Sequence, residues 1–236
     1  MCDFMDVEIE TIPIDVIKRN LDIISTRIFD ACKKVNLDPK EITFVAVIKN
    51  QSNETIKNLF NLGVREFGEN RYQQLEAHQK YFETNNIDFN QEITWNFIGQ
   101  IQSNKITKIA NRSQVIQSVD NLNILNVLGK RTDHKKIYIQ LAGINDQTRG
   151  GVSFENAEEL IKSAEKLKIV LSGVMIVPPF EKDPRPYFNK AREFAKKHNL
   201  DEISMGMTSD FEIAIECGAT TIRVGSAIFK PNNYAL

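Results

Sequence analysis

The run Thr43-Phe44-Val45-Ala46-Val47-Ile48, with Lys49 directly after it, decides the fold class of this chain. It is short, continuously apolar and rich in β-branched residues, which is typical of a strand buried on both faces of a parallel sheet. Seven further short apolar runs follow it, at 65–67, 95–98, 115–119, 137–141, 169–175, 202–205 and 220–224. Helical stretches separate these runs, at 53–62, 69–82, 102–111, 121–132, 154–167, 186–198 and 209–217.

The regular alternation of strands and helices implies a parallel sheet. Eight such units in a chain of 236 residues match the (β/α)₈ TIM barrel. We predict that fold, and an open doubly wound sheet is the competing architecture. Apolar residues also recur every three or four positions from Ile14 to Val35, which predicts an additional N-terminal helix. We expect residues 1–11 to form a loose tail and residues 12–236 to form one domain.

The composition excludes several classes of protein. Apolar residues make up 42% of the chain, charged residues 26%, and the formal net charge is -1. This balance provides no bulk positive field for nucleic acid or anionic membrane. No apolar run is long enough to span a bilayer, and the first residues lack the pattern of a signal peptide. The cysteines Cys2, Cys32 and Cys217 are few and far apart, as expected in a reducing compartment. We therefore expect a cytoplasmic protein without nucleic-acid or membrane partners.

Lys49 is the first candidate functional residue. In a barrel, functional side chains gather where strands end and the following loops begin, and Lys49 has this position after the first strand. Partial desolvation at a strand end would favour reaction of its amine with a carbonyl compound. A solvated surface lysine is the simpler alternative.

Two segments near the C-terminus together predict a phosphate site, because the loops after strands seven and eight often bind phosphate in barrels. Thr208 and Ser209 lie between the seventh strand and the next helix, and Ser209 and Glu212 have the spacing of a capping box. Hydroxyls and free backbone N–H groups would meet there. Gly225 allows a close approach of the backbone after the eighth strand, and Ser226 adds a donor. Simple helix capping is the alternative for the first segment.

Three further polar residues leave two interpretations open. Arg223, just before Gly225, either points inward as a fixed positive charge or pairs with a carboxylate of a surrounding helix. Asn70, after the second strand, either offers its amide to a ligand or caps the next helix. Ser103 is a plausible N-cap for the helix at 102–111, and capping is the favoured interpretation there.

Several kinds of chemistry have no motif in this sequence. The three histidines, His78, His134 and His198, fall in helical stretches, and no HExxH sequence occurs, so we expect no metal site. The chain has neither a GxGxxG sequence after the first strand nor a Walker A sequence. The GxSxG elbow of serine hydrolases is also missing.

Five segments of the chain, taken in order, resemble the pyridoxal phosphate homeostasis proteins, which are relatives of the barrel half of alanine racemase. The resemblance covers residues 14–229 and depends on the order and spacing of all five segments. They are Val45-Ala46-Val47-Ile48-Lys49, Arg65-Glu66-Phe67-Gly68-Glu69-Asn70, Trp95-Asn96-Phe97-Ile98-Gly99-Gln100-Ile101-Gln102-Ser103-Asn104-Lys105, Ser204-Met205-Gly206-Met207-Thr208-Ser209-Asp210 and Arg223-Val224-Gly225-Ser226-Ala227-Ile228-Phe229.

The resemblance implies a fold type III barrel like the N-terminal domain of alanine racemase, with pyridoxal 5′-phosphate (PLP) as the cofactor. It implies that Lys49 forms the internal aldimine, that Arg223 faces the pyridine nitrogen and that Asn70 lines the cofactor. It also implies a phosphate grip by the hydroxyls and backbone N–H groups of the two C-terminal segments, at Thr208, Ser209, Gly225 and Ser226.

The sequence departs from the family pattern at several positions. Ile48 stands where the family usually has Ser, Asn96 where it has His, and Thr208 where it has Ser. Arg149-Gly150-Gly151 replaces Lys-x-Gly, and Lys230 replaces a Gly. None of these changes removes the candidate lysine or the candidate phosphate grip.

The expected function follows from two features that do not favour catalysis. A positive charge beside the ring nitrogen opposes its protonation, so the cofactor would be a weak electron sink that supports transamination and elimination poorly, whereas racemisation needs less stabilisation. A racemase needs a second base, and neither the tyrosines nor a further β domain after the eighth strand supplies one in this sequence. We expect a monomeric protein that is not an enzyme and that stores or delivers PLP, with PLP-dependent apo-enzymes as recipients. The alternatives are a weak amino-acid racemase and a phosphate-binding barrel enzyme in which Lys49 is an electrostatic ligand.

Overall fold

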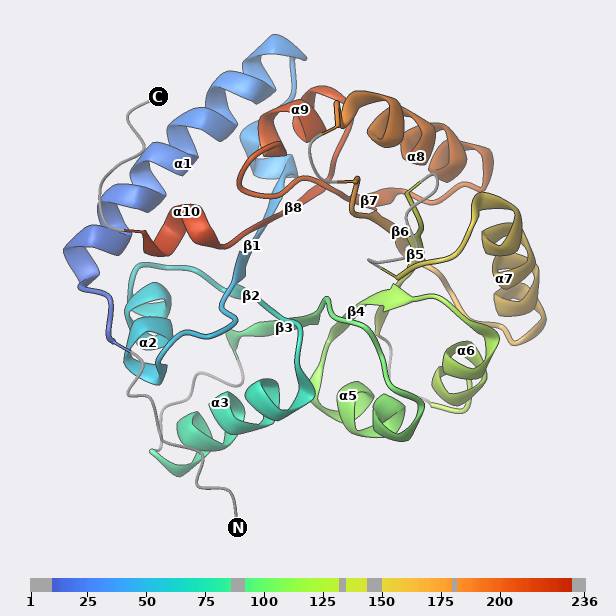
Figure 1. Ribbon diagram of the computed structural model, residues 1–236, viewed down its shortest axis with the longest axis horizontal. Helices are drawn as coiled ribbons and strands as arrows, with labels where there is room; N and C mark the ends of the chain where they lie inside the picture. The colour runs from blue at the N-terminus through green and yellow to red at the C-terminus, as the bar shows by residue number, and fades with distance from the viewer. Residues whose placement is uncertain (1–9, 86–91, 132–134, 144–149, 180–181, 231–236) are drawn as a thin grey trace.

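Eight parallel strands close into a barrel in the order in which they occur along the chain (Figure 1). The structure, a computed structural model, describes residues 10–85, 92–131, 135–143, 150–179 and 182–230. The predicted TIM barrel is confirmed, and the open doubly wound sheet is wrong because β8 pairs with β1 as well as with β7. The strands are β1 (Thr43–Val47), β2 (Glu66–Glu69), β3 (Thr94–Phe97), β4 (Val115–Val119), β5 (Lys136–Leu141), β6 (Gly173–Ile176), β7 (Glu202–Ser204) and β8 (Thr221–Val224).

Helices surround the barrel and bury their apolar faces against the outer side of the strands (Figure 1). This burial is the main source of stability in such a fold. The helices are α1 (Ile14–Lys34), α2 (Asn53–Asn61), α3 (Tyr72–Thr84), α5 (Ile106–Arg112), α6 (Leu122–Leu128), α7 (Phe154–Lys166), α8 (Arg185–Lys197), α9 (Phe211–Glu216) and α10 (Ser226–Phe229), with 3₁₀ turns at Pro39–Glu41 and Ser103–Lys105.

The additional N-terminal helix is confirmed as α1, which lies across α9 and α10 (Figure 1). Its buried face contains Ile17, Ile24 and Ile28, at the spacing expected from the sequence. Asn20 on the same face donates from Nδ2 to the carbonyl oxygens of Ile228 (2.8 Å) and Lys230 (3.1 Å). The helix α1 therefore holds α10, the element that directly follows β8.

The sixth strand begins later than predicted. The sequence indicated a strand at 169–175, but β6 starts at Gly173, where pairing with Tyr138 begins. Ile169 and Leu171 pack against the core on the way into the strand, whereas Val170 between them is 83% exposed, and an apolar run of this kind cannot be distinguished from a strand by its pattern alone. Gly173 itself is required, since a Cβ there would lie 1.8 Å from the carbonyl oxygen of Glu202.

The helix predicted at 102–111 is divided in two. A 3₁₀ turn at Ser103–Lys105 comes first, closed by a bond from the Lys105 N–H to the Gln102 carbonyl (2.8 Å), and α5 begins only at Ile106. The expected N-cap role of Ser103 is therefore wrong, because the chain makes this tighter turn before the α-helix starts.

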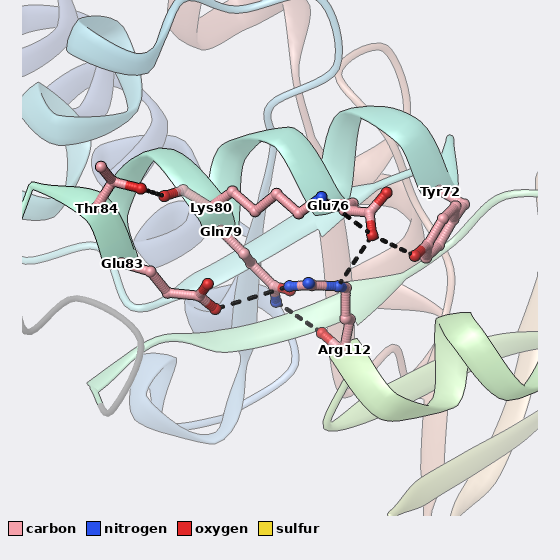
Figure 2. A network of polar contacts seen from close by, with 7 residues as sticks. All are labelled: Tyr72, Glu76, Gln79, Lys80, Glu83, Thr84 and Arg112. Carbon is pink, nitrogen blue, oxygen red and sulfur yellow. Dashed lines mark hydrogen bonds and ion pairs between the residues drawn. The ribbon is translucent and has the colours of Figure 1, made fainter.

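Arg112 links α3 to α5 on the outer wall of the barrel (Figure 2). Its guanidinium donates to Gln79 Oε1 (3.0 Å) and pairs with Glu76 (3.8 Å) and Glu83 (3.7 Å). The Gln79 amide in turn donates to the Arg112 carbonyl (2.7 Å). This network joins two neighbouring helices and lies outside the barrel interior.

Most of the predicted tail lies outside the described residues, as do Cys2, His134 and Arg149. Its last residue, Thr11, lies near the start of α2, with Oγ1 3.1 Å from Ser52 Oγ, and the N–H of the next residue, Ile12, donates to Thr55 Oγ1 (2.9 Å). The division into a tail and one domain over 12–236 stays a prediction. In the part of the chain that the structure describes, no helix is long and apolar enough to cross a membrane.

Candidate functional site

Lys49 lies in the turn that follows β1, at the end of the barrel where all eight strands finish. The turn is closed by a bond from the Gln51 N–H to the Ile48 carbonyl (3.1 Å). Lys49 is exposed to solvent, which agrees with the solvated alternative rather than with partial desolvation at the strand end. The neighbouring Ile48, one of the departures from the family pattern, is fully buried in the apolar core.

The loops after β7 and β8 meet beside the end of β1. Thr208 Oγ1, in the first loop, accepts a hydrogen bond from the backbone N–H of Ala227 (3.4 Å), which follows the second loop. Gly225 lies so close to β1 that a Cβ on it would be 3.2 Å from the Val47 carbonyl oxygen. Ser209 and Ser226 are both exposed there. Hydroxyls and backbone N–H groups from two loops therefore surround one region, which is suitable for an anion.

The capping box expected from Ser209 and Glu212 is wrong. The helix α9 starts at Phe211 with Asp210 as its N-cap residue, and Asp210 Oδ1 accepts instead from the Met207 N–H (2.6 Å). Glu212 is turned toward α1, where its Oε1 accepts from Arg27 Nε (2.6 Å). The ion pair with α1 uses the carboxylate that the spacing assigned to the cap, and Ser209 is left available at the loop surface.

Arg223 points into the barrel, which resolves the two interpretations of its sequence position. Only 4% of the residue is exposed. Its NH1 donates to Ser204 Oγ (2.6 Å), and its NH2 donates to the Ile176 carbonyl (3.1 Å). Burial lowers the pKa of Arg223 to about 10, while the nearby Asp210 carboxylate acts in the opposite direction. The guanidinium is still charged at neutral pH and is a fixed cation inside the barrel.

Asn70 does not cap α3, which begins at Tyr72 with Arg71 as its N-cap residue. Its side-chain Oδ1 is buried and has no hydrogen-bond partner among the residues that the structure describes, so it could accept a hydrogen bond from a ligand. The backbone of Asn70 lies against Gly99, where a Cβ would be 2.0 Å from the Asn70 carbonyl oxygen. The loops after β2 and β3 are therefore in direct contact.

Glu69 is a buried acid that the sequence interpretation did not identify. Its Oε1 accepts from the backbone N–H groups of Asn70 (2.7 Å) and Arg71 (3.3 Å). Burial raises the pKa of Glu69 to about 7, although these bonds and the charges of Arg71 and Lys49 act against the shift. Its Oε2 lies 3.9 Å from His78 Nε2 on α3, and burial lowers the pKa of His78 to about 4.

The structure brings several of the predicted site residues to neighbouring strands. Lys49 follows β1, the segment with Gly225 and Ser226 follows β8, and the segment with Thr208 and Ser209 follows β7. These three strands are consecutive around the barrel, and Arg223 lies on the middle one. Asn70 follows β2, on the other side of β1. An amine, a region rich in hydrogen-bond donors and a buried cation thus lie on neighbouring strands, a combination suited to a phosphorylated carbonyl compound.

Comparison with known proteins identifies the family. A family model for the alanine racemase N-terminal domain matches residues 16–233, which is nearly the whole chain. The chain belongs to the alanine racemase N-terminal domain family. Members of that family share this barrel with the protein described here, and the resemblance found in the five sequence segments is confirmed.

Two curated relatives resemble this chain over nearly its whole length. A pyridoxal phosphate homeostasis protein of Aquifex aeolicus is 33% identical over 222 residues, covering 88% of this chain and 95% of the relative. One of Haemophilus influenzae is 30% identical over 235 residues, covering 93% and 97%. The match therefore extends over almost the full length of both proteins.

Solved structures of PipY also resemble this chain over most of its length. PipY of Synechococcus elongatus with PLP bound is 27% identical with a TM-score of 0.73, covering 91% of this chain and all of that one. The PLP-free structure of PipY is 29% identical with a TM-score of 0.75, covering 88% of this chain and 100% of that chain. Alanine racemase of Corynebacterium glutamicum, 15% identical with a TM-score of 0.65 and coverage of 95% and 63%, shares the fold.

Proposed function

We propose that this protein binds pyridoxal 5′-phosphate and acts in the homeostasis of that cofactor in the cytoplasm, without being an enzyme. The observation that supports this most directly is the contact between the loops after β7 and β8 beside the end of β1, with Lys49 and Arg223 on the same neighbouring strands. Relatives with this name and the PLP-bound structure of PipY support the same conclusion.

Each candidate residue has a chemical role in this proposal. PLP, when bound, supplies an aldehyde and an electron-withdrawing ring. The Lys49 amine would hold the aldehyde end covalently, and Arg223 would direct an N–H toward the ring nitrogen. Asn70 Oδ1, buried without a partner, fits a donor on the ligand.

The phosphate would be held where the two loops meet, by backbone N–H groups and hydroxyls that donate hydrogen bonds to its oxygens. Thr208, Ser209 and Ser226 provide hydroxyls, and the backbone around Gly225 provides N–H groups. A Cβ on Gly225 would make a tight contact with Val47, and without a side chain the Gly225 backbone can approach a ligand closely.

The site offers little support for catalysis. The Arg223 guanidinium, a permanent cation, opposes a second positive charge on the ring nitrogen and so weakens the withdrawal of electrons, which disfavours transamination and elimination more than racemisation. In the described part of the chain, the hydroxyls of Tyr72 and Tyr81 donate to Glu76 and Glu54, and that of Tyr138 donates to Glu202. These tyrosines are engaged with carboxylates, which does not suit a second base.

We further propose that the protein is a monomer that passes PLP to PLP-dependent apo-enzymes. The exposed position of Lys49 supports this, because a solvent-accessible link to the cofactor can be reversed without unfolding the site. The test is transfer of PLP from the loaded protein to an apo-enzyme in a buffer free of other PLP, with sedimentation measuring the oligomeric state. If the apo-enzyme stays inactive, the delivery role is wrong.

The binding function is tested by titrating the protein with PLP and following its visible absorbance. We expect saturable binding with a shifted visible band in the wild type and in Lys40→Ala, which removes an exposed lysine before β1. Lys49→Ala should lose the shifted band. An unchanged band in Lys49→Ala would assign the link elsewhere, and Lys49-dependent loss of optical activity from alanine would show an enzyme instead.

A further inference from the structure

Five polar side chains form a continuous line of hydrogen bonds through the barrel interior, which we call the interior polar chain. Four contacts connect its members: Arg223 NH1 donates to Ser204 Oγ (2.6 Å), Ser204 Oγ donates to Gln117 Oε1 (2.7 Å), Gln117 Nε2 donates to Asn96 Oδ1 (2.9 Å), and Asn96 Nδ2 donates to Glu66 Oε2 (2.8 Å). Ser204 and Gln117 are fully buried, and Asn96 is 2% exposed. Four of the eight strands thereby connect to Arg223 on β8.

The chemistry at the two ends sets the direction of every bond. A guanidinium can only donate, so Ser204 Oγ accepts from it and gives its single proton to Gln117. The Gln117 amide then presents its NH₂ group to Asn96, which presents its own NH₂ group to the Glu66 carboxylate, a group that can only accept. Reversing either amide would place oxygen against oxygen or nitrogen against nitrogen. The interior polar chain therefore has one satisfied arrangement.

This single arrangement restricts the orientation of the Arg223 guanidinium. Its NH1 is tied to Ser204, and its NH2 to the Ile176 carbonyl (3.1 Å), so the plane of the guanidinium has two separate anchors. An arginine carries five N–H donors, and these two bonds use two of them. Because a buried, half-satisfied network is costly, the loss of one member should affect its neighbours.

We propose that Ser204, Gln117 and Asn96 are positioning residues that fix the orientation of Arg223 toward the ring nitrogen of the bound cofactor, with Glu66 as the anchor of the line. The inference rests on the proposed binding of PLP for its effect on the ligand. Its first part, the immobilised guanidinium, concerns the protein without any ligand. Asn96, where the family usually has His, is thus a member of a supporting network and has an amide that matches its two neighbours.

The ligand-dependent part is tested with Ser204→Ala, Gln117→Leu and the conservative variant Ser204→Thr. We expect the first two to weaken PLP binding about tenfold, the usual effect of losing a hydrogen bond to a charged group. They should also shift the ¹⁵N signal of cofactor labelled at the ring nitrogen, while borohydride still traps PLP on Lys49. Ser204→Thr, which keeps the hydroxyl, should retain both wild-type values.

The matched control is Ser113→Ala, which removes an equally buried hydroxyl (1% exposed) outside the interior polar chain. It should leave the affinity and the ¹⁵N signal unchanged. If folded Ser204→Ala and Gln117→Leu bind PLP with wild-type affinity and a wild-type ring-nitrogen signal, the positioning role is wrong. A general effect of cavity formation would instead appear in Ser113→Ala as well.

The immobilised guanidinium is tested in the protein without cofactor, and the only variant needed is one that assigns the NMR signals. In the wild-type protein without cofactor, the Nη protons of Arg223, assigned by their loss in Arg223→Lys, should give separate and slowly exchanging NMR signals. Rapid averaging of these signals would overturn the proposal even if PLP binds. Conversely, failure of PLP to bind would disprove the proposed function, but it would not affect the NMR evidence that the Arg223 guanidinium is immobilised.

Discussion

Thr208 is the residue that most clearly separates binding of the phosphate from binding of the ring. Its hydroxyl lies between the two loops that meet at the site. We expect Thr208→Val to weaken PLP binding about tenfold because a phosphate loses a hydroxyl donor, whereas Thr208→Ser should keep most of the affinity. Binding of pyridoxal, which lacks the phosphate, should be equal in the two variants. Titrations of all three proteins with both ligands measure this, and an equal loss for pyridoxal would contradict a phosphate role.

Gly99 is required by the contact between the loops after β2 and β3. An added Cβ would lie 2.0 Å from the Asn70 carbonyl oxygen, so Gly99→Ala should lower the free energy of unfolding by roughly 2–4 kcal/mol. Gly63→Ala is the comparison, because Gly63 has a φ of 91° but open space around it and should cost only about 1–2 kcal/mol. Urea unfolding of the two variants measures the difference, and equal losses would show that the close contact is unimportant.

At the residue scale, the sequence predicts the location of residues that directly follow an apolar strand. Lys49 ends an apolar strand and Gly225 follows one, so both were expected at the rim of the barrel. Ser204 and Gln117 could not be identified in the same way, because a polar residue in a strand gives no sign of which distant strand provides its partner. The bond between them joins residues 87 positions apart.

The helix α1 is the element through which the N-terminal region supports the site. Asn20 donates to the carbonyls of Ile228 and Lys230 at the end of α10, and it is largely buried. Asn20→Ala should lower the free energy of unfolding by about 1–3 kcal/mol, since it removes a buried donor to the Ile228 carbonyl. The exposed Arg19→Ala on the same helix should change it by less than about 0.5 kcal/mol. Thermal or urea unfolding measures both, and similar small effects would mean that α1 and α10 are coupled by apolar contacts alone.

At the element scale, the order and type of the strands and helices followed from the hydrophobic pattern, but some boundaries did not. The helix at 102–111 was predicted as one piece because its apolar spacing continues through a 3₁₀ turn. The capping box at Ser209 failed because Glu212 has a partner on α1, 185 residues away in sequence. The error at the capping box comes from an interaction beyond the segment, whereas the error at 102–111 comes from a local 3₁₀ bond that the spacing of apolar residues does not reveal.

The pH dependence of stability is a property of the whole molecule to which Glu69 and His78 contribute with opposite signs. The Glu69 pKa of about 7 lies above its ordinary value of 4.5, so the folded state keeps a proton that the unfolded chain loses, and stability falls as pH rises between these values. The His78 pKa of about 4 lies below 6.5, so stability rises with pH between 4 and 6.5. The two effects largely offset each other over the shared range.

Glu69→Gln removes the first effect and keeps an oxygen that can accept from the Asn70 N–H. Relative to the wild type, this variant should gain about 2–3 kcal/mol in the free energy of unfolding between pH 5 and pH 7.5. Urea unfolding at a series of pH values measures this gain, with the exposed Glu159→Gln as control. Parallel stability curves for the wild type and Glu69→Gln would show that Glu69 ionises normally in the folded state.

For the molecule as a whole, the decisive measurement is reduction of the PLP-loaded protein with borohydride followed by peptide mapping. The proposed function requires the visible band to disappear and the reduced cofactor to be found on the peptide that contains Lys49. A label on another lysine, or a band that borohydride removes without leaving any cofactor on the chain, would contradict it.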